Sequence, residues 1–296
     1  MRPLIVALLV AASGTGLAAQ SPNTDVFLAP LARRGDSLIV GAAENVTRRP
    51  GYDNQPSFLP DASAFLYTVI GADAQADTWR YDIKAGRSSR VTTTPESEYS
   101  PTVIPGAPRF SVVRVERDSS QRLWSFALNG TDPQLVLADL LPVGYHAWLG
   151  PNRLVAYVLG SPSTLHVIDR SGANDEVRAR DIGRALQRIP GQGWYSFTRR
   201  DGERVMWIVS QPFEGGPVAP LVRAPADNEY HVWTPEGALL SASEGAIVRW
   251  NARTGDDGEW LPIATIPGVK NISRLAVSPD GRWLAFVAEP VAPVAP

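Results

Sequence analysis

The fold is decided by a short pattern that is clearest at residues 274–287, which read Arg274-Leu275-Ala276-Val277-Ser278-Pro279-Asp280-Gly281-Arg282-Trp283-Leu284-Ala285-Phe286-Val287. A polar or aromatic lead-in precedes a short apolar strand, a turn and a second apolar strand. Proline and glycine mark the turn between the two strands. The same plan occurs six times along the chain, with apolar landmark residues at Phe58, Val103, Trp148, Phe197, Trp233 and Val277.

The landmarks are 36 to 49 residues apart, which is the repeat length of propeller blades made of short strands. In most segments a third strand follows and ends at a glycine-bearing turn, as at Gly86, Gly130, Gly172 and Gly255. The sequence therefore predicts an all-β fold, a single six-bladed β-propeller of four-stranded blades over residues 24–289. The predicted blades cover about residues 53–94, 98–138, 144–181, 191–224, 227–267, and 270–289 together with 24–46.

The sixth blade is short of two strands, because only a Pro-rich tail, residues 290–296, follows its inner pair. Two unassigned apolar strands lie at the other end of the chain, at residues 26–29 and 37–40. We expect these N-terminal outer strands to pair with the C-terminal inner strands, because closing the ring removes an exposed sheet edge. Residues 181–188 remain as an insertion between blades three and four, either a short helical turn or a loop.

Composition excludes several classes of protein. Basic residues number 28 and acidic residues 30, so there is no strongly basic surface for nucleic acid. The absence of cysteine excludes disulfides, thiolate metal sites, a cysteine nucleophile and a lipidated N-terminal cysteine. Hydrophobic residues make up 44% of the chain, which is enough for a folded core.

The first residues have the layout of a secretory signal peptide. Met1-Arg2 provides a positive start, residues 4–12 are apolar, and small residues lead to a cleavage site after Ala18 or Ala19. The apolar run is too short to span a bilayer, and no later stretch is long and apolar enough to do so. We therefore expect residues 1–19 to be removed and the mature protein to be periplasmic or secreted, with no transmembrane segment.

Two stretches carry a family resemblance, Asp53-Asn54-Gln55-Pro56-Ser57-Phe58-Leu59-Pro60-Asp61 and Ser278-Pro279-Asp280-Gly281-Arg282-Trp283-Leu284-Ala285-Phe286. Their lead-in and turn resemble the TolB-like, or WD40-like, six-bladed propeller repeat. Residues 90–101 are similar to that family's connection from an outer strand to the next blade. The resemblance implies an exported bacterial protein that serves as a binding scaffold. TolB also carries an N-terminal α/β domain, whereas fewer than ten mature residues precede the first strand here, so a Tol–Pal translocation role is not expected.

The sequence lacks the common catalytic motifs. It has no nucleophile elbow, no phosphate-binding or dinucleotide-binding loop, and no helical His-Glu-x-x-His pair. Of the three histidines, His166 lies in a third strand and is expected to be structural. His146 and His231 occupy equivalent positions, two residues before Trp148 and Trp233, and both tryptophans are predicted to be buried between neighbouring blades.

The starts of the inner strands are predicted to converge on one mouth of the central channel. Aromatic side chains there provide rigid contact area, while carboxylates and imidazoles provide polarity and a response to pH. The predicted ligand- or partner-binding site consists of Asp53, Asn54, Gln55, Glu98, Tyr99, Tyr145, His146, Trp194, Tyr195, Glu229, Tyr230, His231 and Arg274. The alternative is that the aromatic rings fill the channel and the acids only face solvent.

The preferred functional interpretation is a non-catalytic binding module that holds a ligand, or a protein or peptide partner from the cell envelope, at this mouth without a metal or cofactor. A hydrolase or lyase is the second interpretation, with His146 or His231 as the base beside Glu98 or Glu229. A metal-dependent form of it would use Asp53 together with those four side chains. The third is an accessory subunit of an envelope enzyme or transport complex.

Overall fold

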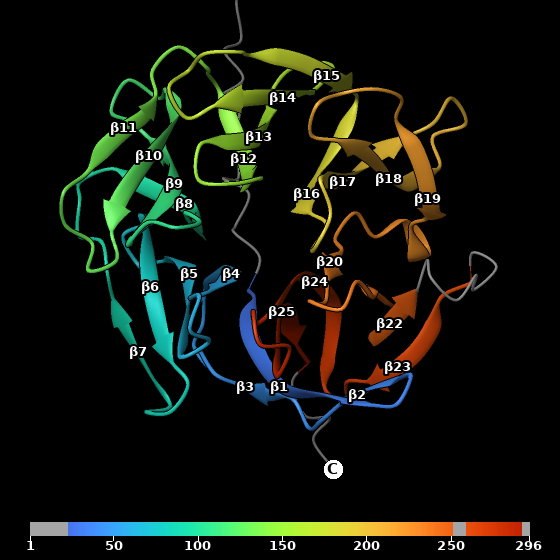
Figure 1. Cartoon of the computed structure of the whole chain (residues 1–296). Helices are drawn as coiled ribbons and strands as arrows, with labels where there is room; N and C mark the ends of the chain where they lie inside the picture. Colours follow the sequence, from blue (N-terminus) through green and yellow to red (C-terminus); the bar gives the residue numbers. More distant parts are fainter. Residues whose placement is uncertain (1–22, 251–258, 292–296) are drawn as a thin grey trace, which may run out of the picture.

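The computed structural model describes residues 23–250 and 259–291, and it shows six antiparallel sheets arranged in a ring (Figure 1). Five sheets are four-stranded blades formed by consecutive strands, and the sixth combines strands from both ends of the chain. In the two described ranges the only helical element is the short 3-10 turn Pro225–Asp227. The predicted six-bladed propeller is confirmed. No helix among these residues has the length and apolar character that crossing a membrane requires.

Each of the five consecutive blades runs from an inner strand at the channel to an outer strand at the rim. Their strands are β4 (Tyr52–Phe58), β5 (Ala64–Ile70), β6 (Ala76–Asp82) and β7 (Arg87–Arg90) in blade one; β8 (Ser97–Val103), β9 (Arg109–Val115), β10 (Gln121–Ala127) and β11 (Gln134–Leu137) in blade two; β12 (Val143–Trp148), β13 (Arg153–Val158), β14 (Thr164–Asp169) and β15 (Glu176–Arg180) in blade three; β16 (Ile182–Arg188), β17 (Trp194–Arg200), β18 (Met206–Pro212) and β19 (Ala219–Arg223) in blade four; and β20 (Val232–Trp233), β21 (Leu239–Ser243), β22 (Ala246–Trp250) and β23 (Leu261–Thr265) in blade five.

The core lies between the blades. The second strand of each blade has neighbours on both faces, and its sequence is accordingly almost continuously apolar. In β5 every residue from Ala64 to Val69 is buried. Phe110 of β9 stacks on Phe126 of β10, and both are part of the cluster that blade two shares with Leu66 of blade one. Packing of this kind fixes how each inner strand sits at the channel.

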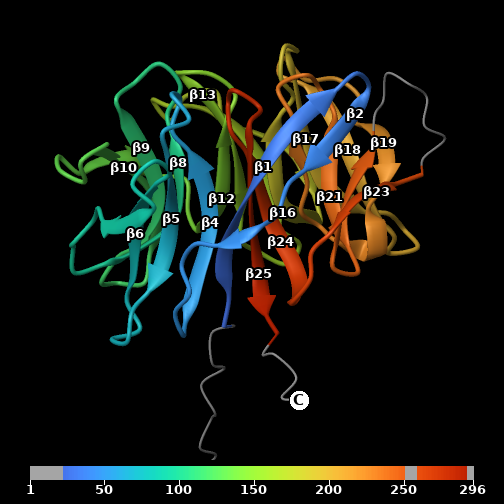
Figure 2. The ribbon, with the colours of Figure 1, turned by 90° about the horizontal axis from the view of Figure 1, so that it is seen from below.

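Blade six is closed by strands from both ends of the chain (Figure 2). The C-terminal part supplies β24 (Val269–Val277) and β25 (Trp283–Pro290), and the N-terminal part supplies β1 (Asp25–Arg34) and β2 (Ser37–Val40), with β3 (Glu44–Asn45) also paired to β1. Strand β1 runs antiparallel to β25, with Asp25 opposite Ala288 and Pro30 opposite Trp283. Phe27 stacks on Phe286 with ring centroids 5.4 Å apart. The predicted closure is confirmed.

Blade four differs from the sequence prediction by one strand. Residues 182–188 form neither a helical turn nor a loop but β16, the inner strand of this blade. The segment that begins at Trp194, predicted to be the inner strand, is β17, and the predicted second strand near residue 206 is the third, β18. The error arose because Phe197 was taken as the landmark of the inner strand although it lies on β17, and the Ile189-Pro190-Gly191 turn after β16, which repeats Ile104-Pro105-Gly106 after β8, was overlooked.

Three predicted features fall wholly or partly outside the described residues. These are the signal peptide at 1–19, the glycine turn at Gly255, and all but the first two residues of the tail at 290–296.

Candidate functional site

The inner strands carry bulges that turn side chains toward the channel. Gln55, Ser100 and Arg274 each have a positive φ, between 49° and 61°, although none is glycine. Each lies three residues before its blade's landmark, and the strand pairing shifts register at the same place. A left-handed backbone at a residue other than glycine carries strain, and such strain often marks functional positions. These three residues and their neighbours line one pocket on the channel axis.

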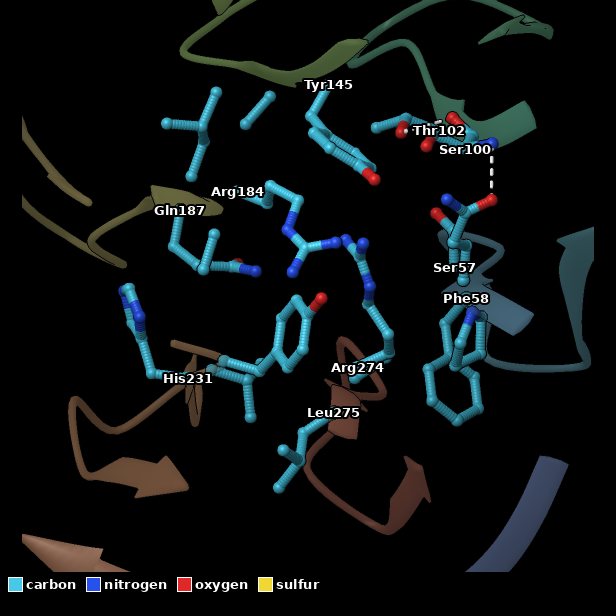
Figure 3. A pocket seen from close by; sticks show the side chains of 18 of the residues that line it. Ser57, Phe58, Ser100, Thr102, Tyr145, Arg184, Gln187, His231, Arg274 and Leu275 are labelled. Carbon is cyan, nitrogen blue, oxygen red and sulfur yellow. Dashed lines mark hydrogen bonds between the residues drawn. The ribbon is translucent and has the colours of Figure 1, made fainter. Parts of the chain in front are cut away.

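The pocket has a volume of about 310 Å³ and is enclosed by the inner strands of all six blades and the segment that leads into β20. Its polar lining consists of arginine, tyrosine, histidine, serine, threonine and glutamine side chains, and no acidic residue of the described ranges lines it. Figure 3 shows Arg184 and Arg274 extending toward each other in its centre, with Tyr145 pointing to the same place. Polar side chains of this lining include Ser57, Ser100, Tyr145, Arg184, Tyr230 and Arg274.

Arg274 is the central cation of the pocket. It extends from blade six to Tyr145 of blade three, on the opposite side of the ring (Figure 1). Its Cζ lies 4.5 Å from the centroid of the Tyr145 ring and 4.3 Å from that of Tyr230. These two cation–π contacts hold the guanidinium group against the faces of both rings. Within the described residues, Arg274 makes no hydrogen bond and no ion pair.

Arg184 is the second cation, and it has a partner. Its Nη2 lies 2.5 Å from Glu229 Oε1, and its backbone N–H donates to Glu229 Oε2 at 2.9 Å. Gly183 permits this approach, because a Cβ at that position would lie 3.0 Å from Glu229 Oε2 and 2.2 Å from Thr198 Oγ1. Burial alone would raise the pKa of Glu229, but the hydrogen bonds and charge of Arg184 hold it below its usual value. Glu229 therefore stays ionised and neutralises Arg184.

Tyrosine hydroxyls surround this pair of arginines. The neighbouring phenols and the charge of Arg274 act on the pKa values of Tyr52 and Tyr230. Burial raises the pKa of Tyr230 to about 12 and raises that of Tyr52 further, despite the opposing charge of Arg274. Both phenols therefore remain neutral near pH 7 and are able to donate hydrogen bonds.

Asp53 and Glu98 lie on inner strands but do not line the pocket. Asp53 is fully buried and pairs with Arg49 at 2.6 Å; burial raises its pKa to about 6. Glu98 is also fully buried, and burial raises its pKa to about 7 against the effect of hydrogen bonds from Thr94 and Thr92. Each of these acids thus has its own polar partners, on the segment that leads into its inner strand.

The two equivalent histidines form the same contact in two places. His146 Nε2 lies 2.6 Å from Ser111 Oγ, which also accepts a hydrogen bond from Trp148 Nε1 at 2.8 Å. His231, Ser196 and Trp233 repeat this arrangement at 2.8 Å for both contacts. In both cases the serine belongs to the second strand of the preceding blade, so the group joins two neighbouring blades.

Both tryptophans are buried as predicted, with exposed fractions of 5% for Trp148 and 7% for Trp233. Both imidazoles touch the pocket wall but are also buried, and burial lowers the pKa of each to about 3. A neutral imidazole with so low a pKa is a weak base, so neither histidine is suited to general-base catalysis.

This burial has a consequence for stability that can be measured. An unfolded histidine takes up a proton below about pH 6.5, whereas the folded His146 stays neutral, so its contribution to stability is present above that pH and is lost as the pH falls. We expect the stability advantage of the parent over His146→Gln to shrink by roughly 2–3 kcal/mol between about pH 7 and pH 4.5. Urea unfolding of both proteins across this range measures the difference.

Asp53 and Glu98 shift stability in the opposite direction, because their raised pKa values favour the folded state as the pH falls. Both acids are present in the parent and in the variant, so their contribution cancels in the comparison. A constant difference between the two proteins across the pH range would contradict the buried, neutral state of His146.

The structure brings some of the predicted site residues together and separates others. Those that line the pocket are Gln55, Tyr145, His146, Tyr230, His231 and Arg274. Those on or beside inner strands but outside the lining are Asp53, Asn54, Glu98, Tyr99 and Glu229. Trp194 and Tyr195 lie on β17, a second strand, and Tyr195 is fully buried with its hydroxyl donating to Gln211 Oε1, so their assignment to the mouth is wrong.

The residue that sequence reasoning missed is Arg184, because its segment was not assigned to an inner strand. The acids and histidines proposed for a metal-dependent site are also dispersed. In the described part of the chain, no group of three or more histidine, aspartate or glutamate side chains is placed to hold a metal ion. Asp53 is paired with Arg49, and Glu229 with Arg184. Glu98 accepts hydrogen bonds from Thr92 and Thr94.

Comparison with known proteins shows which fold this chain shares. No family model matches the sequence, and no curated protein matches it either. Among solved structures, a protein described as TolB from Agrobacterium tumefaciens is similar over 93% of this chain and 100% of its own, with a TM-score of 0.70 and 14% identity. The chain has a TolB-like propeller fold.

Other structures share this TolB-like propeller. TolB from Acinetobacter baumannii matches 88% of this chain with a TM-score of 0.55 and 11% identity, and this chain covers 63% of that protein. A protein from Xanthomonas campestris, described as a gluconolactonase important in glucose secondary metabolic pathways, has a TM-score of 0.61 and 9% identity over 88% of this chain and 94% of its own. Identities at this level show the shared fold and nothing about activity.

Proposed function

We propose that this TolB-like propeller is an exported, non-catalytic binding module that holds a ligand, or a short segment of a protein partner, in the channel pocket. The observation that carries the proposal is the set of strained, non-glycine residues Gln55, Ser100 and Arg274, which place polar side chains around a single pocket. Strained residues cluster at binding and active sites, and here they recur at equivalent positions of three blades around one pocket.

Export to the periplasm or the medium is part of the proposal. It is supported by the signal-like sequence of residues 1–19 and by the likeness to structures described as TolB. Mass determination of the N-terminus of the protein recovered from the envelope tests it, and a chain that still begins at Met1 would contradict cleavage.

The binding proposal is tested by filling the pocket. Ser57 lines the wall and is half-buried, so a Ser57→Trp substitution places an indole in the cavity. A ligand at about 100 times its Kd stabilises a folded protein by ~2.7 kcal/mol, which corresponds to a rise in Tm of roughly 5–10 °C for a chain of this size. We expect a panel of sugars, sugar acids and short peptides to contain ligands that raise the Tm of the parent but not that of the variant.

Ala85→Trp, in the exposed turn between β6 and β7, is the matched control and should respond as the parent does. A ligand that stabilises Ser57→Trp and the parent equally would place the binding site elsewhere on the molecule. Product analysis of the same mixtures tests the hydrolase or lyase alternative. Conversion of any of these compounds by the parent protein would support that alternative. Affinity capture with the mature chain identifies a partner enzyme if the chain is an accessory subunit.

A further inference from the structure

We propose that the group recognised in the channel pocket is a carboxylate, bound by the free edge of the Arg274 guanidinium with Arg184 as a second cation. This inference rests on the proposed function and names the chemistry of its ligand. It is drawn from the charges, the unused hydrogen-bond donors and the size of the pocket.

The charge of the pocket favours an anion. Two arginines line it and no acidic side chain does. Glu229 compensates Arg184 directly, at 2.5 Å, while it acts on Arg274 only through its longer-range field. One positive charge therefore remains without an ion-pair partner in the described structure. Two guanidinium groups that extend toward each other, as in Figure 3, repel unless an anion lies between or beside them.

The geometry of Arg274 favours a planar anion. Tyr145 and Tyr230 approach the guanidinium at 4.5 and 4.3 Å, and none of its N–H groups donates a hydrogen bond to a described residue. A carboxylate accepts two parallel hydrogen bonds from a guanidinium edge, and this bidentate contact is the geometry that arginine provides and lysine does not. The stacked tyrosines thus hold the group ready to bind, which reduces the entropy lost on binding.

Further donors surround the same point. The Ser100 side chain lines the pocket and is 8% exposed, and its buried Oγ has no hydrogen-bond partner. A buried hydroxyl without a partner costs free energy, and this one lies behind the pocket wall beside Arg274. The Tyr230 phenol remains protonated because burial raises its pKa to about 12, so it can donate to an anion rather than repel it. A cationic ligand at this place would be repelled by the positive charge of Arg274.

The volume limits the ligand. A cavity of about 310 Å³ holds a small organic acid or the end of a peptide, but not a folded surface. A free acid and a peptide C-terminus present the same carboxylate, and the experiment must separate these two sources.

Binding is measured by calorimetry with four probes in two matched pairs. Glucuronate is compared with glucose, and N-acetyl-trialanine is compared with its C-terminal amide. We expect at least one charged probe to bind the parent at least tenfold more tightly than its neutral counterpart. Glucuronate alone would identify a free acid as the source, and the acetylated tripeptide alone would identify a chain terminus.

Arg274→Gln should weaken binding of the charged probe tenfold or more, and Arg274→Lys should restore only part of it, because lysine keeps the charge without the planar edge. Arg117→Gln, in the exposed turn between β9 and β10, removes an equal charge outside the pocket and should leave binding unchanged. Inorganic phosphate serves as the competing anion.

Three results would overturn the inference: equal affinity for charged and neutral probes, tighter binding of phosphate than of either carboxylate, or failure of both carboxylates to bind at millimolar concentration. In each of these cases the proposed function would still hold if a neutral ligand bound the parent and Ser57→Trp abolished that binding. Loss of the proposed function requires instead that binding of every ligand be insensitive to Ser57→Trp.

Discussion

Removing residues 23–40 should abolish the folded monomer. Strands β1 and β2 supply the outer half of blade six, and β1 forms six residue pairs with β25, from Asp25–Ala288 to Pro30–Trp283. Without them β25 becomes an open edge whose residues Leu284 to Ala288 are all buried in the intact ring. An exposed apolar edge strand pairs with other chains. We expect the truncated protein to elute as aggregates in size-exclusion chromatography, whereas the mature protein elutes as a folded species.

A single substitution tests the same closure without deleting a strand. Phe27→Ala removes the ring stacked on Phe286 and should lower the free energy of unfolding by about 3–5 kcal/mol. Ile39→Ala, on the exposed side of β2, should change it by less than about 0.5 kcal/mol. A soluble, cooperatively unfolding monomer after deletion of residues 23–40 would show that the ring does not depend on its N-terminal strands.

Trp233→Ala should have an effect of similar size. The indole is 7% exposed in the cluster between blades four and five, and its Nε1 donates to Ser196 Oγ at 2.8 Å. Loss of a buried side chain of this size costs about 3–5 kcal/mol of stability. Trp148→Ala should match it, because the same contact is repeated between blades two and three. Chemical unfolding monitored by circular dichroism measures both.

Two further variants separate packing from hydrogen bonding at this contact. Trp233→Phe keeps most of the ring but loses the donor, and Ser196→Ala leaves Trp233 Nε1 and His231 Nε2 without their common partner. Each should cost about 1–3 kcal/mol, the range for an unsatisfied buried polar group. If Ser196→Ala leaves the stability unchanged, the serine–histidine–tryptophan contact does not stabilise the interface between blades.

The fold was predictable from the sequence because the features that define it are local. Proline, glycine and apolar landmarks such as Trp148 and Trp233 recur at blade spacing, and each blade buries its second strand on both faces. Blade closure was also predictable, since the C-terminal blade visibly lacked two strands. Blade four was misassigned because Phe197 of β17 was taken as the inner-strand landmark, although the Ile189-Pro190-Gly191 turn after β16 matches the turn after β8.

The candidate site was only partly predictable. The positions of Tyr145, Tyr230 and Arg274 followed from the convergence of the inner strands. Their roles did not, because stacking depends on the left-handed φ at Arg274, which no residue type in the sequence signals. The histidines show the same limit, since their identical spacing from tryptophan indicated a shared role but could not show that the imidazoles pack against serines of the neighbouring blades.

The pairing of β1 with β25 also determines where the two ends of the described chain emerge. Asp25 lies opposite Ala288, Pro290 lies opposite Val269, and Thr24 bridges to Tyr52, so both ends are on the face where the inner strands begin. An affinity tag, a fluorophore or a fused domain added at either end would project from that one side. Immobilisation through either terminus would therefore present the opposite face, which carries the turns that follow the inner strands, to the solution.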